Sequence, residues 1–297
     1  MSNLQLLTFM KKALILVNQH ARSGKKLFSQ ATVELQALGF ELIEESTDHS
    51  HQISDTIRRY KNQVDLVIIG GGDGTLNATI EGLIDSQLPL GILPMGTAND
   101  LARTLGIPTS LREACQVIAT GKIRRIDLGW VNGKHFFNVA SLGLSVQITQ
   151  LLTKEVKRRW GILAYAATAL QVVWQSRPFR AEIRVNNQSI QVKTIQIAIG
   201  NGRYYGGGMT VAEDATIDDQ RLDLYSLETK HWWQIIALLP AMRQGNHASW
   251  PGVRALYGEE IEVRSVKRHR INTDGEITTH TPAIFRVIPK ALAVFVP

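Results

Sequence analysis

Three consecutive glycines follow a strongly apolar run in this sequence, and they constrain its fold more than any other feature. Residues 64–70, VDLVIIG, are rich in β-branched side chains, and Gly70–Asn77 reads GGGDGTLN before a helical pattern. Glycines at a strand end let backbone N–H groups approach a phosphate, whose charge the following helix N-terminus favours. A plain strand-to-helix turn capped by Asp73 or Thr75 is the alternative, but such a cap does not need three glycines.

This loop departs from two common phosphate-binding motifs. No Gly-Lys-Ser/Thr follows, as a Walker A loop would require, and the third glycine of the dinucleotide fingerprint is missing. Two more loops follow apolar runs, at residues 18–25 and at 96–100. Adjacent parallel strands would bring such loops to the carboxyl edge of one sheet, where open α/β folds bind ligands. A solvated basic turn at 18–25 and an ordinary Asn or Asp helix cap at 96–100 are the alternatives.

The order of the patterns predicts an α/β fold with two domains. Strand-like runs at residues 13–18, 40–47, 64–70 and 88–94 alternate with helical segments, which indicates a parallel sheet covered by helices. We therefore expect an N-terminal open parallel-sheet nucleotide-binding domain over residues 1–125. The last strand of the chain is a candidate to return to it.

The second half has a different sequence pattern, which predicts an antiparallel β-rich, sandwich-like domain over residues 126–297. Alternating apolar and polar residues dominate this half, and Asn186-Asn187 between two such runs indicates a hairpin. Two helical inserts are expected near residues 150–175 and 230–245. No repeat or low-complexity segment interrupts the pattern.

Composition limits the classes of partner. With 44% apolar and 20% charged residues, the 297-residue chain is not mainly disordered, and Cys115 is its only cysteine. This excludes a disulfide within the chain and a cysteine-based metal site, and it favours a reducing, cytoplasmic location. The net charge of +7 suggests an anionic partner. The basic run 267–270 has no interleaved aromatic residue, so no nucleic acid is expected, and no apolar run reaches the ~18 residues of a membrane span.

Together the loops resemble the diacylglycerol-kinase catalytic domain family, in particular the YegS-like bacterial lipid kinases. The strings GGDGTLN (71–77) and GTANDLA (96–102) stand at the family's spacing, and the likeness continues more loosely after residue 150. The GGDGT string alone is shared with NAD kinases and phosphofructokinases. The resemblance implies ATP as a cofactor. The implied nucleotide-binding residues are Asn18, Arg22, Thr47, Gly71, Gly72, Asp73, Gly74, Thr75, Asn77, Gly96, Thr97, Asn99 and Asp100.

The resemblance also implies a magnesium site in an acidic segment, AEDATIDDQRLDL (212–224). Carried over by position, Asp219 would bind Mg²⁺ with main-chain oxygens near Thr216 and Arg221. Magnesium prefers oxygen ligands, which this segment supplies in number. The family usually has Asp-Gly-Leu where this chain has Asp219-Gln220-Arg221, so the loop geometry is in question. An acidic, solvated loop is the alternative.

A catalytic base is implied by the segment Asp274-Gly275-Glu276. In the resembled family the corresponding segment supplies the base, which we place on Glu276, with Asp274 as the alternative. By its pattern alone, Asp-Gly between two alternating runs favours a hairpin turn. Both interpretations can hold, because a tight turn can present a carboxylate.

These residues predict an ATP- and Mg²⁺-dependent lipid kinase. Phosphoryl transfer depends mainly on positioning and charge neutralisation, and a base would accept the proton of the attacking hydroxyl. The acceptor expected from the resemblance is a lipid hydroxyl, such as that of diacylglycerol or phosphatidylglycerol. An NAD-kinase-type nucleotide kinase and a nucleotide- or lipid-binding regulator with little catalysis are the alternatives.

Two apolar stretches suggest where a membrane would be contacted. The basic residues of 154–159 precede an apolar run that ends at Trp174, and His231-Trp232-Trp233 opens a second apolar stretch. Basic residues beside Trp and aliphatic residues suit an anionic membrane interface. Packing of these helices on the β-rich domain is the alternative. The expected partners are thus a lipid substrate and, peripherally, an anionic membrane surface, and a homodimer is left open.

Overall fold

The computed structural model describes residues 11–17, 24–46, 51–151, 171–229 and 231–297. The chain divides into two compact units, each described here by itself. Unit 1 comprises residues 1–102, 106–125 and 292–297, and unit 2 comprises residues 103–105 and 126–291. Among the described residues, no helix is both long and apolar enough to span a membrane.

Unit 1 is built on a parallel sheet with the strand order β2-β1-β3-β4. The strands are β1 (Lys11–Val17), β2 (Phe40–Ser46), β3 (Leu66–Gly71) and β4 (Leu90–Pro94). Every residue of β3 is buried, as expected for a strand covered on both faces. The predicted parallel α/β architecture is therefore confirmed.

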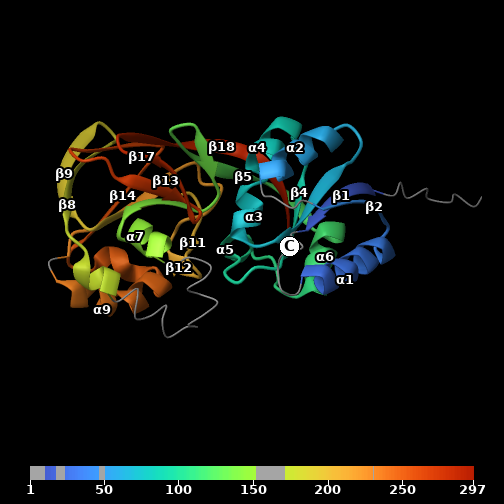
Figure 1. Ribbon diagram of the computed structural model, residues 1–297, viewed down its shortest axis with the longest axis horizontal. Helices are drawn as coiled ribbons and strands as arrows, with labels where there is room; N and C mark the ends of the chain where they lie inside the picture. The colour runs from blue at the N-terminus through green and yellow to red at the C-terminus, as the bar shows by residue number, and fades with distance from the viewer. Residues whose placement is uncertain (1–10, 18–23, 47–50, 152–170, 230) are drawn as a thin grey trace, which may run out of the picture. The chain divides into compact units, whose positions relative to one another are not determined.

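Helices cover both faces of this sheet (Figure 1). On one face lie α1 (Gly24–Ala37) and α6 (Leu111–Thr120), and on the other α2 (His51–Tyr60) and α4 (Ile80–Ser86). Two single-turn helices, α3 (Asp73–Asn77) and α5 (Asp100–Thr104), follow β3 and β4. Because both follow parallel neighbours, the two glycine-bearing loops begin at the same edge of the sheet.

Two long strands, β5 (Lys122–Val131) and β18 (Ala283–Val296), contribute residues to both units. The end of β18 pairs in parallel with β4, with Val294 opposite Leu90. The last strand of the chain thus supplies a strand to the parallel sheet of unit 1.

Unit 2 contains an antiparallel six-stranded sheet with the order β14-β13-β10-β7-β16-β17. A second layer is formed by β18, β15, β8 and β9, with β5 and β6 beside it. A core rich in Val, Ile, Leu and Phe lies between the layers, including Phe136, Leu224 and Phe285. The predicted antiparallel β-rich domain is therefore confirmed. The strands are β6 (Lys134–Phe136), β7 (Val139–Gly143), β8 (Phe179–Val185), β9 (Gln188–Thr194), β10 (Gln196–Gly200), β13 (Leu222–Leu227), β14 (Val253–Gly258), β15 (Glu260–Ser265), β16 (Arg270–Thr273) and β17 (Glu276–His280), with a small pair β11 (Tyr204–Tyr205) and β12 (Met209–Thr210).

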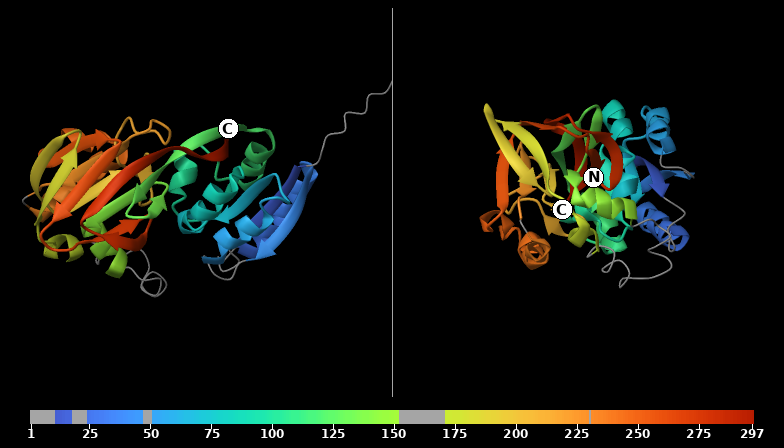
Figure 2. Two further views of the ribbon diagram at one scale, coloured as in Figure 1. Left: turned by 90° about the horizontal axis from the view of Figure 1, so that it is seen from above. Right: turned by 60° about the vertical axis from the view of Figure 1, so that its left-hand side comes forward.

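Helices α7 (Leu144–Leu151) and α9 (Trp232–Gln244) lie on the outer side of the six-stranded sheet (Figures 1 and 2). A second apolar core, which includes Tyr225 and Leu238, lies beneath them. The insert predicted near 230–245 is confirmed as α9, with a short 3-10 helix, η1 (Asn246–Ser249), after it. Most of the insert predicted near 150–175 lies outside the described residues.

Two predicted hairpins are confirmed. Asn186 and Asn187 join β8 to β9 with φ values of 49° and 63°, the left-handed region that Asn tolerates better than most residues. Asp274 and Gly275 join β16 to β17 with φ values of 47° and 96°. Both pairs suit the two-residue turns whose twist matches antiparallel strands.

Candidate functional site: two glycine loops, a carboxylate turn and an acidic loop

The two glycine loops of unit 1 touch through their glycines. A Cβ placed on Gly96 would lie 2.5 Å from the Cα of Gly72, and one placed on Gly72 would lie 3.1 Å from the Cα of Gly96. The N–H of Met95 donates to the carbonyl of Gly71 at 2.9 Å. Glycine is therefore needed at 96, and a side chain at 72 would press on the Gly96 backbone, because the two backbones approach so closely.

Side chains at the next positions hold the loops in shape. The Asn99 amide clamps Gly96 reciprocally: its Oδ1 accepts from the Gly96 N–H and its Nδ2 donates to the Gly96 carbonyl, both at 2.9 Å. Asp73 joins one loop to the other, because its Oδ1 accepts from the N–H of Leu101 at 3.1 Å. Asp100 is buried in the first turn of α5, and Thr97 is exposed. The structure thus brings together the predicted residues of 71–77 and 96–100.

Gly74 and Asn77 have features that packing does not explain. A Cβ on Gly74 would meet no atom within 4 Å, and its φ is not in the left-handed region. The buried Oδ1 of Asn77 accepts no hydrogen bond from any described residue. An open position beside contacting glycines fits a loop that receives an anionic ligand such as a polyphosphate, and the Asn77 Oδ1 is left for a ligand group that can donate a hydrogen bond, such as a hydroxyl.

Three of the predicted nucleotide-binding residues, Asn18, Arg22 and Thr47, lie outside the described residues. They stay predictions from the resemblance.

The turn between β16 and β17 in unit 2 is fixed by the Asp274 carboxylate. It accepts three backbone N–H groups, from Phe137 at 2.7 Å and from Asn138 and Val139 at 3.0 Å each. Its own N–H donates to the carbonyl of Val139 at 3.0 Å. Both carboxylate oxygens are thus engaged, which suits a residue that positions the turn.

Glu276 begins β17 with its side chain exposed, and it makes no hydrogen bond or ion pair with another described residue. Of the two carboxylates in this segment, Glu276 is therefore the one with lone pairs free to receive a proton.

In the acidic loop, the three predicted metal-site residues converge on one carboxylate. Asp219 accepts the N–H of Thr216 at 3.1 Å and the N–H of Arg221 at 3.3 Å. The Arg221 guanidinium lies among three aspartates: Nη2 donates to Asp214 at 2.8 Å, and Nε lies 3.4 Å from Asp223 and 3.5 Å from Asp219. The chain's own cation therefore offsets part of the negative charge of this loop.

These contacts fit a resident metal ion poorly. Among the described residues, no group of three or more His, Cys, Asp or Glu side chains is arranged to hold a metal ion. The Arg221 guanidinium also lies 3.5 Å from Asp219, so it competes with a metal ion for that carboxylate.

Asp127 is a residue to which the sequence gives only a weak signal. It is buried, and its carboxylate accepts the N–H of Gln220 and the N–H of Lys290, both at 2.7 Å. Burial raises its pKa, and the two backbone donors oppose that shift. Asp127 therefore holds the acidic loop in place by accepting main-chain hydrogen bonds.

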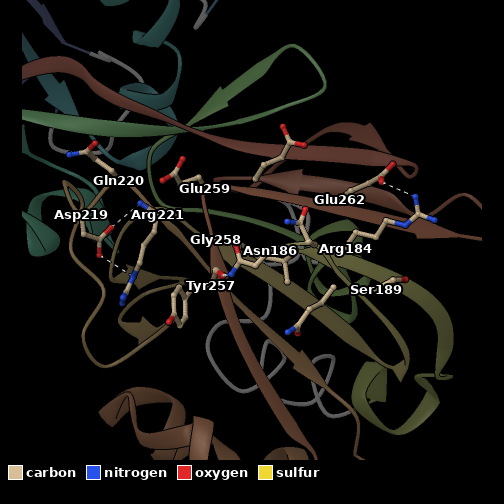
Figure 3. A pocket seen from close by; sticks show the side chains of 14 residues that line it. Arg184, Asn186, Ser189, Asp219, Gln220, Arg221, Tyr257, Gly258, Glu259 and Glu262 are labelled. Atoms are coloured by element: carbon tan, nitrogen blue, oxygen red, sulfur yellow. Dashed lines mark hydrogen bonds and ion pairs between the residues drawn. The ribbon is translucent and has the colours of Figure 1, made fainter.

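A pocket of about 970 Å³ in unit 2 has the acidic loop as one wall (Figure 3). The β8–β9 hairpin and residues 257–260 complete it. Arg221 lies over the ring of Tyr257, 5.2 Å from its centre, and both side chains line the pocket. Deeper in the loop, burial raises the pKa of Asp223 to about 6, against the lowering effect of Arg221.

Comparisons with known proteins match both units. Residues 12–131 match the diacylglycerol kinase catalytic domain, and residues 138–296 match the YegS C-terminal NAD kinase beta sandwich-like domain. The match to the diacylglycerol kinase catalytic domain places this two-unit chain among the lipid kinases. The chain belongs to the YegS-like family of diacylglycerol-kinase-type enzymes.

Relatives match along nearly the whole length. A diacylglycerol kinase of Staphylococcus saprophyticus is 28% identical over 294 residues, covering 97% of this chain and 96% of the relative. A diacylglycerol kinase of Bacillus subtilis is 28% identical over 299 residues, covering 97% of each. The crystal structure of a diacylglycerol kinase from Bacillus anthracis str. Sterne has a TM-score of 0.81 at 24% identity, covering 98% of both chains, and so shares the fold.

Proposed function

We propose that this lipid kinase transfers the γ-phosphoryl group of ATP, with Mg²⁺ as its counter-ion, to the hydroxyl of a diacylglycerol-type lipid. The names of the relatives support this acceptor. The paired glycine loops support a polyphosphate donor, because they combine close backbone approach with an open position at Gly74. ATP supplies the phosphoryl group, and Mg²⁺ would neutralise the charge of its phosphates.

In this proposal the residues of each loop have distinct tasks. Gly74 leaves room for phosphate oxygens beside backbone N–H groups, while Gly71, Gly72 and Gly96 let the two loops pack closely enough to form the site. Asn77 offers its buried Oδ1 to a ligand group that can donate a hydrogen bond, such as a hydroxyl. Asp73 and Asn99 position the loops through the hydrogen bonds described above. Thr75, Thr97 and Asp100 complete the proposed nucleotide site.

Glu276 is the proposed general base. A lipid hydroxyl must lose its proton as it attacks the phosphorus, and an exposed carboxylate with free lone pairs can accept it. Asp274 is proposed to position Glu276 by holding the turn that carries it.

The observation that carries the nucleotide proposal is the open space at Gly74. Alanine there clashes with nothing in the protein and favours a helical backbone, so Gly74→Ala should leave the free energy of unfolding unchanged or raise it by up to about 1 kcal/mol. If phosphates approach this position, the added methyl should weaken ATP binding at least tenfold. Calorimetric titration with Mg-ATP and urea unfolding measure the two effects. Unchanged affinity in a stably folded variant would refute the proposal.

Gly72→Ala is the matched comparison. Its Cβ would press on the backbone of Gly96, so both stability and binding should fall. The contrast separates a glycine needed by the fold from one needed by the ligand.

The acceptor is tested with γ-labelled ATP and a panel of dispersed lipids, with NAD as a separate acceptor. Label in diacylglycerol, lost in Glu276→Gln, is the expected result. Label in NAD would replace the proposed function with nucleotide phosphorylation. The proposed cellular setting is the cytoplasm with reversible contact to an anionic membrane.

A further inference from the structure

The outward face of α9 is apolar along most of its length. Trp232, Trp233, Ile236 and Leu239 are 45%, 55%, 39% and 44% exposed, and Ala237 and Pro240 between them are exposed as well. The first charged residue of the helix is Arg243, in its last turn. Soluble proteins seldom leave such a continuous uncharged apolar face in water.

Packing on the β-rich unit does not account for this face. The opposite side of α9 makes that contact, through Ile235, Leu238, Ala241 and Met242, which are all buried in the second apolar core. Helix packing and an exposed apolar surface are thus both present on one helix. A surface helix that is apolar all round needs a second apolar partner.

Trp174 extends the same surface. It is 72% exposed, and together with Trp232 it lines a pocket of about 240 Å³ between residues 173–178 and the start of α9. We call Trp174, Trp232, Trp233, Ile236 and Leu239 the tryptophan face.

Two arginines follow residues of the tryptophan face closely in the sequence, Arg177 after Trp174 and Arg243 in the last turn of α9. Arg177 and Arg243 are exposed, and neither makes an ion pair with another residue that the structure describes. Tryptophan is favoured at the level of lipid headgroups, and arginines beside it attract anionic lipids. The chemistry of this surface therefore matches the interface of an anionic bilayer.

We propose that the tryptophan face docks this enzyme on the headgroup region of an anionic phospholipid bilayer. Trp and aliphatic side chains enter the boundary between headgroups and acyl chains, while Arg177 and Arg243 contact lipid phosphates. This assignment rests on the proposed function, since a kinase acting on a membrane lipid must reach its substrate at a bilayer surface.

The test is a vesicle-binding experiment without ATP or acceptor lipid, so its result does not depend on catalysis. The full chain is incubated with equimolar phosphatidylglycerol and phosphatidylcholine vesicles, and the bound fraction is measured by flotation. The variant Trp233→Gln/Ile236→Gln/Leu239→Gln should bind at least tenfold more weakly. Brominated phosphatidylcholine should quench the tryptophan fluorescence of the wild type and much less that of the variant. High salt should weaken wild-type binding, because it screens the arginines.

Ile123→Gln/Val266→Gln is the matched control, since both residues are exposed apolar side chains outside the tryptophan face. It should bind like the wild type. Phosphorylation of a dispersed short-chain diacylglycerol should be the same in all three proteins, which verifies folding and tests the proposed function separately.

Several results would overturn the assignment. Absence of vesicle binding by the wild type, or equal loss in the control and the triple variant, would do so. Equal binding by the triple variant and the wild type would do so too. A wild-type dimer that becomes monomeric in the triple variant, seen by analytical ultracentrifugation, would assign the face to a second copy of the chain instead.

Discussion

The carboxylate of Asp127 holds Gln220 in a left-handed backbone conformation. The Gln220 N–H donates to Asp127 Oδ2 at 2.7 Å, and the φ angle of Gln220 is 60°. This is the position at which the family resemblance implies glycine. The departure noted in the sequence therefore leaves the loop closed, at the cost of a conformation that a non-glycine residue rarely adopts.

Relief of this strain is measurable. Gln220→Gly should raise the free energy of unfolding by about 0.5 kcal/mol, because glycine removes a left-handed penalty of roughly 1 kcal/mol but loses more chain entropy. Gln220→Val should lower it by about 1 to 2 kcal/mol, because a β-branched residue suits this φ least. Urea unfolding of both variants checks the order, and a more stable valine variant would contradict it.

Asp223 should make stability depend on pH. Burial raises its pKa from 3.8 to about 6, so the folded chain binds this proton more tightly than the unfolded chain. The resulting stabilisation is fully present below pH 3.8 and is lost as the pH rises to about 6. Relative to Asp223→Asn, the wild type should therefore lose about 2 to 3 kcal/mol of unfolding free energy over this range. If the unfolding free energies of the two proteins, measured by urea unfolding at each pH, change equally with pH, the prediction is wrong.

Removal of Arg221 should open the acidic loop to a cation. In Arg221→Leu the three surrounding aspartates lose their internal counter-charge, so a divalent or trivalent ion should bind at least tenfold more tightly than in the wild type. Tb³⁺ is a suitable probe because Tyr257 lies beside the guanidinium and can sensitise its luminescence. Adding Asp219→Asn should abolish the gain. Equal Tb³⁺ affinity in wild type and Arg221→Leu would show that the arginine does not compete.

Substitutions of the two carboxylates in the 274–276 turn should have different effects, one on stability and the other on activity. Asp274→Asn replaces a charged acceptor of three N–H groups and should cost about 2 to 3 kcal/mol of unfolding free energy. Glu276→Gln changes an exposed side chain, so stability should hold while kcat falls by about a hundredfold or more. Thermal unfolding measures the stability of the two variants, and transfer of labelled phosphate measures their activity. Full activity in Glu276→Gln would remove it as the base.

The sequence predicts the parallel sheet and the meeting of the two glycine loops because both follow from local patterns. Buried β-branched strands such as 64–70 must lie inside a sheet, and their loops emerge at one edge. The hairpins at Asn186-Asn187 and Asp274-Gly275 are predictable for the same reason. Asn, Asp and Gly tolerate the left-handed backbone conformation that two-residue hairpin turns require.

What the sequence does not reveal depends on contacts between distant residues. Nothing near Asp127 indicates that it accepts the N–H groups of Gln220 and Lys290, since those partners are set by the fold. The position of Arg221 among Asp214, Asp219 and Asp223 is equally invisible, because charge spacing in a loop does not fix where a guanidinium points. Which side of α9 is exposed could also be identified only from the structure, since the helix is apolar on all sides.

The pairing of Val294 with Leu90 has a consequence for how the protein is made. During synthesis, the strands that carry the glycine loops leave the ribosome long before the strand that completes their sheet. The edge of β4 is then an open template for other chains, and a chain truncated before residue 292 would leave it so permanently. We expect nascent chains and products truncated before residue 292 to be clients of chaperones and proteases, so that a lesion in the codons for residues 292–296 damages the unit whose other strands come from the N-terminal part of the sequence.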